Sequence, residues 1–202
     1  MKDAIGKRAL DLFGSSLGLI FLLPLFLLAA AAIKIDSRGP IFFNQNRVGR
    51  DGRIFKIHKF RTMVDDALNL GQDFATSATD VRITRVGYFL RRYNIDELPQ
   101  LANVLKGEMS LVGPRPEVPE IVKLYSPDQK KILSVLPGMT DYASLEFRRE
   151  GELIKQSGDL YKDYVSKILP KKLELQLKYV QEKSFWIDIK LIFKTIGAII
   201  GV

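Results

Sequence analysis

The sequence predicts a mostly helical α+β fold with an N-terminal re-entrant membrane helix, a small β-hairpin and amphipathic interfacial helices around one compact domain. Three observations predict it: a long apolar segment near the N-terminus, an alternating segment with a tight turn after it, and helical periodicity in the remaining chain. We expect two units, a re-entrant membrane anchor over residues 1–38 and a second domain over residues 39–202.

The amino-acid composition excludes several kinds of functional site. The 202 residues include 31 Lys and Arg against 23 Asp and Glu, which gives a net charge of +8. There is no cysteine, so disulfide scaffolds, cysteine-rich zinc sites and thiol nucleophiles are excluded. The single histidine, His58, excludes a multi-histidine metal site, and we interpret it as structural. The chain is basic but has no recognisable nucleic-acid module, so we expect no nucleic acid among its partners.

The apolar segment extends from Leu12 to Ile33, 22 residues without an ionisable side chain. As one helix it would rise about 33 Å, enough to cross the hydrocarbon core of a bilayer. Three interpretations compete: a cleaved signal peptide, a transmembrane helix, and a helix that enters the bilayer and turns back. The segment is longer than the ~7–15-residue apolar core of a signal peptide, which favours the two membrane interpretations.

Proline and flanking charge bear on the choice between a spanning and a re-entrant helix. Pro24 lies near the middle of the segment, where proline removes a backbone donor and bends a helix, although membrane helices tolerate it. Basic residues mark the cytoplasmic side of a membrane segment. They flank this segment on both sides: Lys2, Lys7, Arg8, Lys34, Arg38, Arg47, Arg50, Arg53, Lys56, Lys59 and Arg61. A re-entrant hairpin keeps both flanks on one side, so we favour re-entry.

Residues 39–61 predict two strands around a turn. Apolar residues alternate with polar ones on both sides of Asp51-Gly52, a dipeptide typical of tight hairpins. Six basic residues and one acid lie in this segment. Two interpretations stay open, a ribbon whose cations face water, and a ribbon that attracts anionic lipid headgroups or a phosphate-bearing substrate.

The next elements are helices separated by a loop. Residues 64–80 lack periodicity and predict a loop, while apolar spacing predicts helices over 80–92 and 96–105, the second ending at Gly107. At the C-terminus, residues 185–202 predict an amphipathic helix. It either packs on the protein's own core or lies at a membrane interface, and we favour the interface because its face includes the only tryptophan, near lysines.

The densest polar cluster lies between residues 91 and 116. Asp96 and Glu97 are adjacent, and Pro99 follows at a position typical of the first turn of a helix. The positive end of the helix dipole keeps such carboxylates ionised. They either cap the helix and face solvent, or they hold Mg²⁺ or supply a carboxylate nucleophile.

A second element of this cluster is the turn Gly113-Pro114-Arg115-Pro116, in which one long cation stands between two prolines. The turn is either an ordinary loop or a means of fixing a guanidinium for bidentate contact with phosphate oxygens. An acidic pair, fixed arginine and a membrane segment in one chain together indicate phosphoryl chemistry at a bilayer surface.

The run from Gly39 to Pro116 closely resembles the bacterial sugar transferase family, the small monotopic phosphoglycosyl transferases. The matching pieces are GPIFFNQNRVGRDGRIFKIHKFRTM and ITRVGYFLRRYNIDELPQLANVLKGEMSLVGPRPE, and the opening KRALDLFGS with its apolar segment is similar to the family's anchor. The DELPQL and GPRP elements are the most specific. The resemblance implies that residues 39–202 form the catalytic domain, with residues 185–202 as its C-terminal amphipathic helix.

The resemblance also implies a reaction. Members of the family transfer a phospho-sugar from a UDP-sugar to a polyprenyl phosphate, usually undecaprenyl phosphate, and release UMP. Asp96 would be the nucleophile that forms a covalent aspartyl phospho-sugar, and Glu97 its partner carboxylate at a Mg²⁺ site. Arg115 would bind phosphate or the nucleotide, with Lys59 and Arg61 as further substrate-binding cations.

The implied setting is the cytoplasmic face of the bacterial inner membrane, at the first membrane step of glycoconjugate assembly. Expected partners are the UDP-sugar donor, the polyprenyl phosphate acceptor and membrane lipid, and a homodimer stays open. Two departures concern the anchor, where Leu23 replaces a common serine before Pro24, and residues 137–148, which replace a Gly-Leu and Gln-Val-Asn-Gly pattern. The sugar is therefore not predicted. A non-catalytic membrane-surface scaffold that binds anionic lipid is the alternative function.

Overall fold

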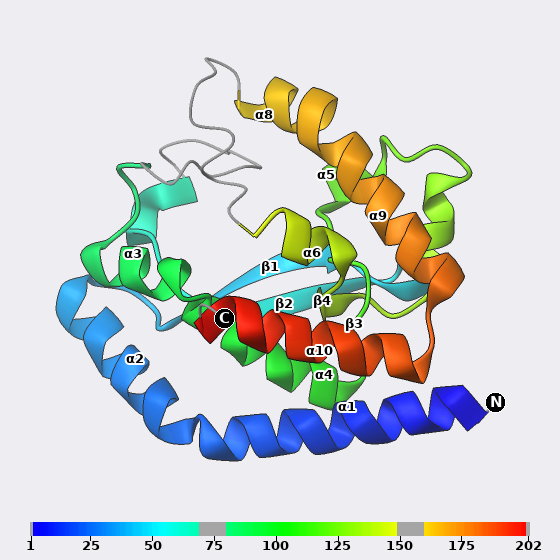
Figure 1. The fold of residues 1–202 in the computed structure, drawn as a ribbon. Helices are drawn as coiled ribbons and strands as arrows, with labels where there is room; N and C mark the ends of the chain where they lie inside the picture. Colours follow the sequence, from blue (N-terminus) through cyan, green and yellow to red (C-terminus); the bar gives the residue numbers. More distant parts are fainter. Residues whose placement is uncertain (1, 69–79, 149–159, 201–202) are drawn as a thin grey trace.

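The computed structural model describes residues 2–68, 80–148 and 160–200, and within them the chain is mostly helical with two small sheets (Figure 1). The predicted α+β class with a small hairpin is confirmed. Two N-terminal helices run along one edge of the molecule, the strands lie in its middle, and the C-terminal helices cover two further sides.

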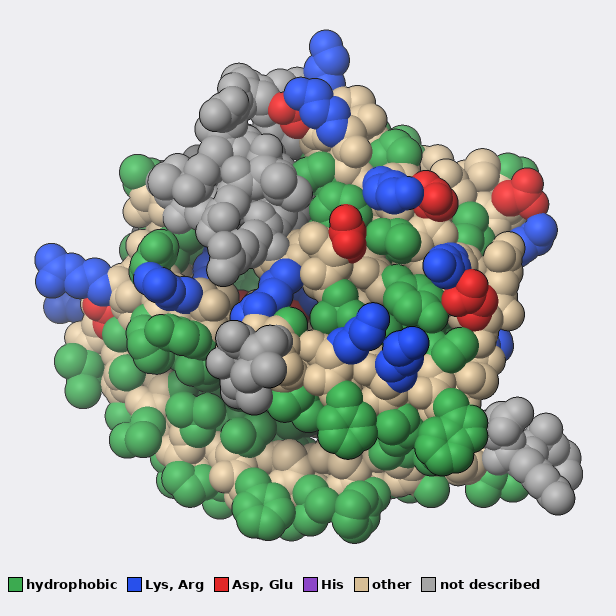
Figure 2. Space-filling model, in the orientation of Figure 1, with side chains coloured by type: hydrophobic (Ala, Val, Ile, Leu, Met, Phe, Trp, Pro, Cys, Tyr) green, Lys and Arg blue, Asp and Glu red, His purple; other side chains and the backbone are tan. Residues whose placement is uncertain are grey.

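The apolar segment forms two helices, α1 (Lys2–Phe21) and α2 (Leu23–Asp36). Their axes are bent by 58° at a break next to Pro24, which confirms the predicted bend. Among the described residues no single helix is long and apolar enough to cross a membrane, and this bent pair meets the criterion by length and composition. Hydrophobic side chains gather along the edge that α1 and α2 form (Figure 2).

Two glycines of α1 let this helix lie close against the rest of the protein. A Cβ atom at Gly14 would come 2.7 Å from Leu111 Cδ1, and one at Gly18 would come 2.9 Å from Leu101 Cδ1. Both separations are too short for carbon atoms in contact, so a larger residue at either position would require the end of the leucine side chain to shift. The outer face of α1 is apolar and exposed, as at Phe13.

Charged side chains near the start of α1 fix its position. Lys7 Nζ lies 2.6 Å from Asp188 Oδ2 and donates to the Val112 carbonyl at 2.8 Å. The Arg8 guanidinium donates to the carbonyls of Val104 and Leu105, at 2.8 and 2.9 Å. These carbonyls belong to the last turn of α4, and the Val104 carbonyl also accepts a hydrogen bond from the Gly107 amide at 3.0 Å.

The hairpin is confirmed. Strand β1 (Phe42–Val48) pairs antiparallel with β2 (Ile54–Phe60), and Asp51 takes the left-handed conformation in the turn with φ of 57°. A second sheet joins β3 (Ser110–Val112) to β4 (Gly138–Thr140) in parallel.

The central helices differ from the prediction at their N-terminal ends. The expected helix over 80–92 is α3 (Arg85–Arg92), which begins later because Thr84 Oγ1 accepts a hydrogen bond from the Gly87 amide and caps it. The expected helix over 96–105 begins as the 3₁₀ helix η3 (Ile95–Gln100) and continues as α4 (Leu101–Lys106).

Pro99 lies inside η3 and has no N–H to donate, which suits a tight first segment better than a regular α-helix. The predicted end at Gly107 is confirmed, since this residue caps α4 with φ of 83°. The expected loop over 64–80 contains the short 3₁₀ helix η2 (Asp65–Leu68), and residues 69–79 lie outside the described residues.

The remaining helical elements of the described chain follow in order: η1 (Arg50–Gly52), α5 (Pro119–Val122), η4 (Gln129–Ser134), α6 (Tyr142–Glu146), α8 (Leu160–Asp163), the π-helical turn η5 (Tyr164–Ile168), α9 (Leu169–Glu182) and α10 (Phe185–Ile200). A core cluster under α9 joins it to α5 and η4. The predicted C-terminal helix is confirmed. One face of α10 packs on the protein at Leu191, while Trp186 and Phe193 on another face are 77% and 70% exposed.

Candidate active site

A cavity of about 1260 Å³ lies between the hairpin, η3, the turn before Glu117, α6 and α10. Its lining includes all five residues that the sequence predicts for the site: Lys59, Arg61, Asp96, Glu97 and Arg115. The strand β2, the 3₁₀ helix η3 and the proline-rich turn bring these residues together from three distant parts of the chain.

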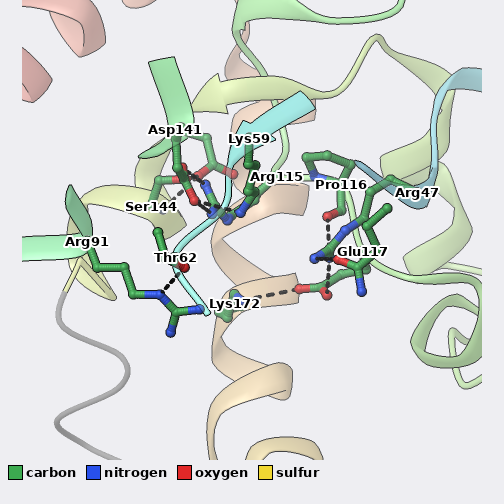
Figure 3. Close-up of polar contacts among 12 residues, drawn as sticks. Arg47, Lys59, Thr62, Arg91, Arg115, Pro116, Glu117, Asp141, Ser144 and Lys172 are labelled. Atoms are coloured by element: carbon green, nitrogen blue, oxygen red, sulfur yellow. Dashed lines mark hydrogen bonds and ion pairs between the residues drawn. The ribbon is translucent and has the colours of Figure 1, made fainter. Parts of the chain in front are cut away.

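Glu97 is held by two cations. Lys59 Nζ lies 2.9 Å from Glu97 Oε1, and Arg115 donates to both carboxylate oxygens, with 2.8 Å to Oε2. Arg115 and Lys59 lie next to each other in this cluster (Figure 3). Burial would raise the pKa of Glu97, but the charges and hydrogen bonds of Arg115 and Lys59 hold it well below its ordinary value. Glu97 is therefore ionised and fixed.

Asp96 has a different environment although it is the next residue. Its side chain lines the cavity, and no residue in the described part of the chain donates a hydrogen bond to its carboxylate. Burial and the neighbouring charge of Glu97 raise the pKa of Asp96 to about 6, against the opposite effects of Lys59 and Arg91. A carboxylate with this pKa is ionised at neutral pH, and its oxygens are available to react.

The left-handed residue Asn94, with φ of 55°, precedes η3 and starts the tight segment that carries both carboxylates. Because a 3₁₀ helix turns by about a third of a circle per residue, consecutive side chains point in different directions. Glu97 meets the cations of β2 and the proline-rich turn, while Asp96 keeps its oxygens free of hydrogen bonds within the described residues.

Of the two carboxylates predicted to hold Mg²⁺, Asp96 is the one whose oxygens are available. Across residues 2–68, 80–148 and 160–200, no group of three or more His, Cys, Asp or Glu side chains that could hold a metal occurs. Magnesium sites commonly use one or two carboxylates and complete their coordination with water and substrate phosphates. The Asp96 oxygens accept no hydrogen bond from the described chain, whereas both Glu97 oxygens bind Arg115 and would have to give up such a contact to reach a metal.

Arg61 occupies another position in the cavity wall. Its guanidinium donates to the carbonyls of Ser37 and Arg38, with 3.0 Å to the Ser37 oxygen. These carbonyls follow directly after α2, so Arg61 ties the end of α2 to the end of β2. The cluster around Glu97 thus includes Lys59 and Arg115, and Arg61 lies on the anchor side of it.

A buried polar network behind Arg115 was not predicted from the sequence. Glu117 accepts hydrogen bonds from Tyr164 Oη at 2.5 Å and Lys172 Nζ at 3.2 Å. Arg47 donates to the Pro116 carbonyl at 3.1 Å (Figure 3). The four side chains of this network also line the cavity. Glu117 directly follows the GPRP motif, which is the one signal in the sequence for this network.

The segment that departs from the family pattern lies at the cavity. Thr140, Ser144 and Arg148 line it, and Asp141 caps α6 by accepting hydrogen bonds from the Ser144 amide and hydroxyl, both at 2.7 Å. Burial raises the pKa of Asp141. Residues 149 and 150 lie outside the described residues.

The cavity combines two cations that are ion-paired with Glu97 and a second carboxylate, Asp96, that accepts no hydrogen bond from the described residues. The chain belongs to the bacterial sugar transferase family, whose sequence model matches residues 2–201. This result confirms the resemblance seen in the DELPQL and GPRP elements.

Three relatives show the range of the family. Undecaprenyl-phosphate glucose phosphotransferase of Komagataeibacter xylinus is 44% identical, with 96% of this chain and 36% of the relative covered. A UDP-N-acetylgalactosamine-undecaprenyl-phosphate N-acetylgalactosaminephosphotransferase of Aeromonas hydrophila is 36% identical, with coverage of 96% and 43%. UDP-glucose:undecaprenyl-phosphate glucose-1-phosphate transferase of Caulobacter vibrioides is 38% identical, with coverage of 96% and 69%. The chain thus spans less than half the length of the first two, and the names differ in their sugar.

Proposed function

We propose that this chain is a phosphoglycosyl transferase that moves a phospho-sugar from a UDP-sugar to undecaprenyl phosphate at the cytoplasmic face of the bacterial inner membrane. The observation that carries this proposal is Asp96, a buried carboxylate without a hydrogen-bond donor from the described residues, beside the ion-paired Glu97 in a cationic cavity. Membership of the bacterial sugar transferase family supports it.

In the first half-reaction, an Asp96 carboxylate oxygen attacks the phosphorus that carries the sugar. The bond between this phosphorus and the oxygen bridging to the uridylyl phosphate breaks, and UMP leaves with the bonding electrons. Lys59 and Arg115 offset the negative charge that the diphosphate brings near a carboxylate nucleophile. Asp96 and Glu97, together with donor phosphates, would hold Mg²⁺, which neutralises phosphate charge when bound.

In the second half-reaction, a phosphate oxygen of the acceptor attacks the same phosphorus. The bond to Asp96 breaks, which restores the carboxylate and gives the polyprenyl diphospho-sugar. Splitting the transfer in this way means that the soluble donor and the lipid acceptor need not occupy the phosphoryl site together. Glu97 holds Arg115 through both of its oxygens, so sharing Mg²⁺ with Asp96 would require one of these contacts to open.

The bent pair α1 and α2 would enter the bilayer and return, so that both basic flanks stay in the cytoplasm. The exposed apolar faces of these helices support this arrangement. The absence of native cysteine makes it testable. Single cysteines at positions 3 and 38 should both resist an impermeant thiol reagent added outside intact cells, and both should react after lysis. Labelling of only one position from outside would show a spanning helix instead.

The reaction is tested with purified protein, Mg²⁺, undecaprenyl phosphate and a panel of UDP-sugars. We expect UMP release with at least one donor and, without acceptor, a mass adduct on the peptide that contains Asp96. Asp96→Asn should abolish both signals, whereas Asp128→Asn, at an exposed position in a surface ion pair, should keep them. UMP release by Asp96→Asn would remove the proposed nucleophile.

The alternative, a non-catalytic scaffold that binds anionic lipid, makes the opposite prediction. The exposed aromatic face of α10 and the lysines of that helix favour lipid contact. A scaffold would bind vesicles equally well after Asp96→Asn and would release no UMP with any donor.

A further inference from the structure

We propose that the half of α10 that borders the cavity forms the binding groove for the first isoprene units of the lipid acceptor, with Ile196 and Ile199 as acceptor-binding residues. This inference rests on the proposed function and assigns one part of the cavity to one substrate. It concerns an element far in sequence from the DELPQL and GPRP elements.

The cavity lining includes two groups of side chains with different chemistry. Around Asp96 its lining is cationic, with Lys59, Arg91 and Arg115. A second part of the lining is apolar: Leu98, Leu101, Leu111, Met139, Leu145, Ile192, Ile196 and Ile199. A UDP-sugar is polar along its whole length and has no group that gains from this second part. A polyprenyl phosphate, an anionic head on a branched apolar tail, complements both parts.

The cavity volume leaves room for a second ligand. At about 1260 Å³ it exceeds the range of roughly 300–1000 Å³ that suffices for drug-sized molecules. A donor bound at the cationic end would therefore leave the apolar part unfilled.

The geometry of α10 gives this apolar part a continuous wall. Ile192, Ile196 and Ile199 are spaced by four and three residues, so they share one face of the helix. Ile196 and Ile199 line the cavity and are nevertheless 50% and 39% exposed, which places them at its open rim. Phe193, 70% exposed, is on the same helix but does not line the cavity.

This wall is fixed to the segment that lines the other side of the cavity. Thr195 Oγ1 and Thr140 Oγ1 are 2.6 Å apart, and Arg148 donates a hydrogen bond to the Ala198 carbonyl. The rim of the groove is thus held at its β4 side and near the C-terminal end of α10, where a tail would enter.

The groove is continuous with the membrane-facing part of the protein. Leu101 and Leu111 line the cavity and, on their other side, contact Gly18 and Gly14 of α1. Hydrophobic side chains on the outer faces of α1 and α10 lie on the same side of the molecule (Figure 2). A tail that enters from this side stays in apolar surroundings up to the level of the carboxylates.

Measuring the two half-reactions separately distinguishes residues that bind the acceptor from residues that bind the donor. With enzyme in detergent micelles, Ile196→Ser and Ile199→Ser should each raise the KM for undecaprenyl phosphate roughly tenfold, because each removes about one buried aliphatic group from tail contact. The first half-reaction, measured as UMP burst and mass adduct without acceptor, should be unchanged. Ile196→Val keeps a branched apolar side chain, so its acceptor KM should stay close to that of the native protein.

Phe193→Ser is the matched control on the same helix and should leave the acceptor KM unchanged. A photoreactive residue at position 199 should crosslink to radiolabelled acceptor, and one at position 193 should not do so above the level of added detergent. Three results would each contradict the proposed groove. The acceptor KM could be unchanged in both serine variants, or Phe193→Ser could raise it equally. The serine variants could also lose the first half-reaction. Wild-type protein that gives neither burst nor adduct with any donor would instead refute the proposed function.

Discussion

Lys172 of α9 and Glu117 form a buried ion pair behind the proline-rich turn, with 3.2 Å between Lys172 Nζ and Glu117 Oε1. Tyr164 joins both partners, because its hydroxyl donates to the carboxylate and accepts from the ammonium at 2.9 Å. Burial would raise the pKa of Glu117, but Lys172 and Arg47 lower it below its ordinary value. The turn that carries Arg115 is therefore followed by a buried carboxylate, Glu117. Removing Lys172 would take away a cation that offsets its charge.

Removing one partner of this pair should strongly destabilise the protein. Lys172→Met leaves Glu117 buried without its ammonium, and we expect a loss of about 3–5 kcal/mol in the free energy of unfolding. The double variant Lys172→Met with Glu117→Gln should lose clearly less than the sum of the single variants. Denaturant unfolding in detergent measures both. Lys131→Met, at an exposed pair, is the control, and additive losses would contradict the coupling.

Asp96→Asn should stabilise the protein in a pH-dependent way. The folded-state pKa of about 6 lies above the ordinary value of 3.8, so the folded protein binds this proton more tightly than the unfolded chain. The contribution of Asp96 to stability is complete below pH 3.8 and is lost as the pH rises through 6. At pH 8 we expect the asparagine variant to be more stable than the native protein by roughly 2–3 kcal/mol.

The measurement is thermal and denaturant unfolding of both proteins, without metal and with chelator, between pH 4 and pH 8. The difference in stability should shrink towards pH 4. A difference that is constant over this range would show that titration of Asp96 is not its cause.

Arg115→Lys should weaken donor use although it keeps the charge. The lysine cannot make the two parallel contacts that the guanidinium makes with Glu97, so neither the carboxylate nor the cation is fixed in the same way. Loss of a charged hydrogen bond corresponds to about a ten- to hundredfold decrease in kcat/KM for the donor. Initial rates of UMP release measure it. Arg53→Lys, at an exposed turn position, should show wild-type rates.

Larger residues at the glycines of α1 should loosen the anchor. Gly14→Val and Gly18→Val place side-chain carbons where Leu111 and Leu101 now lie, and overpacking of this kind costs about 1–3 kcal/mol. Gly6→Val is the matched control, because a Cβ there meets only Phe185 at 3.7 Å. The midpoint of thermal unfolding in detergent should fall for the first two variants and stay close to that of the native protein for the third.

Local signals predicted much of the fold. The Asp51-Gly52 turn, the bend at Pro24 and the helix end at Gly107 each depend on the backbone preference of one or two residues, and each is confirmed. The 3₁₀ form of the helical segment after Asn94 was not predicted. A left-handed residue followed by a 3₁₀ segment depends on packing against β2, which periodicity in η3 alone does not show.

The residues of the candidate site were likewise predictable only in part. Asp96 and Glu97 could be chosen because they are adjacent in a specific motif, and Lys59 and Arg115 line the same cavity, as expected. Their ion pairs with Glu97 were not predicted. The direction of Arg61 towards the end of α2 could not be predicted, since it depends on where that helix ends in the fold. Lys172 gives no signal, because a lysine on an amphipathic helix ordinarily faces water.

Arg8 binds the last carbonyls of α4, and α4 continues without interruption from the segment that carries Asp96. Asp96 and α1 are therefore linked through α4 and the two hydrogen bonds of Arg8. If α1 lies in a bilayer and Asp96 reacts as proposed, this link sets the depth of the carboxylate relative to the lipid headgroups.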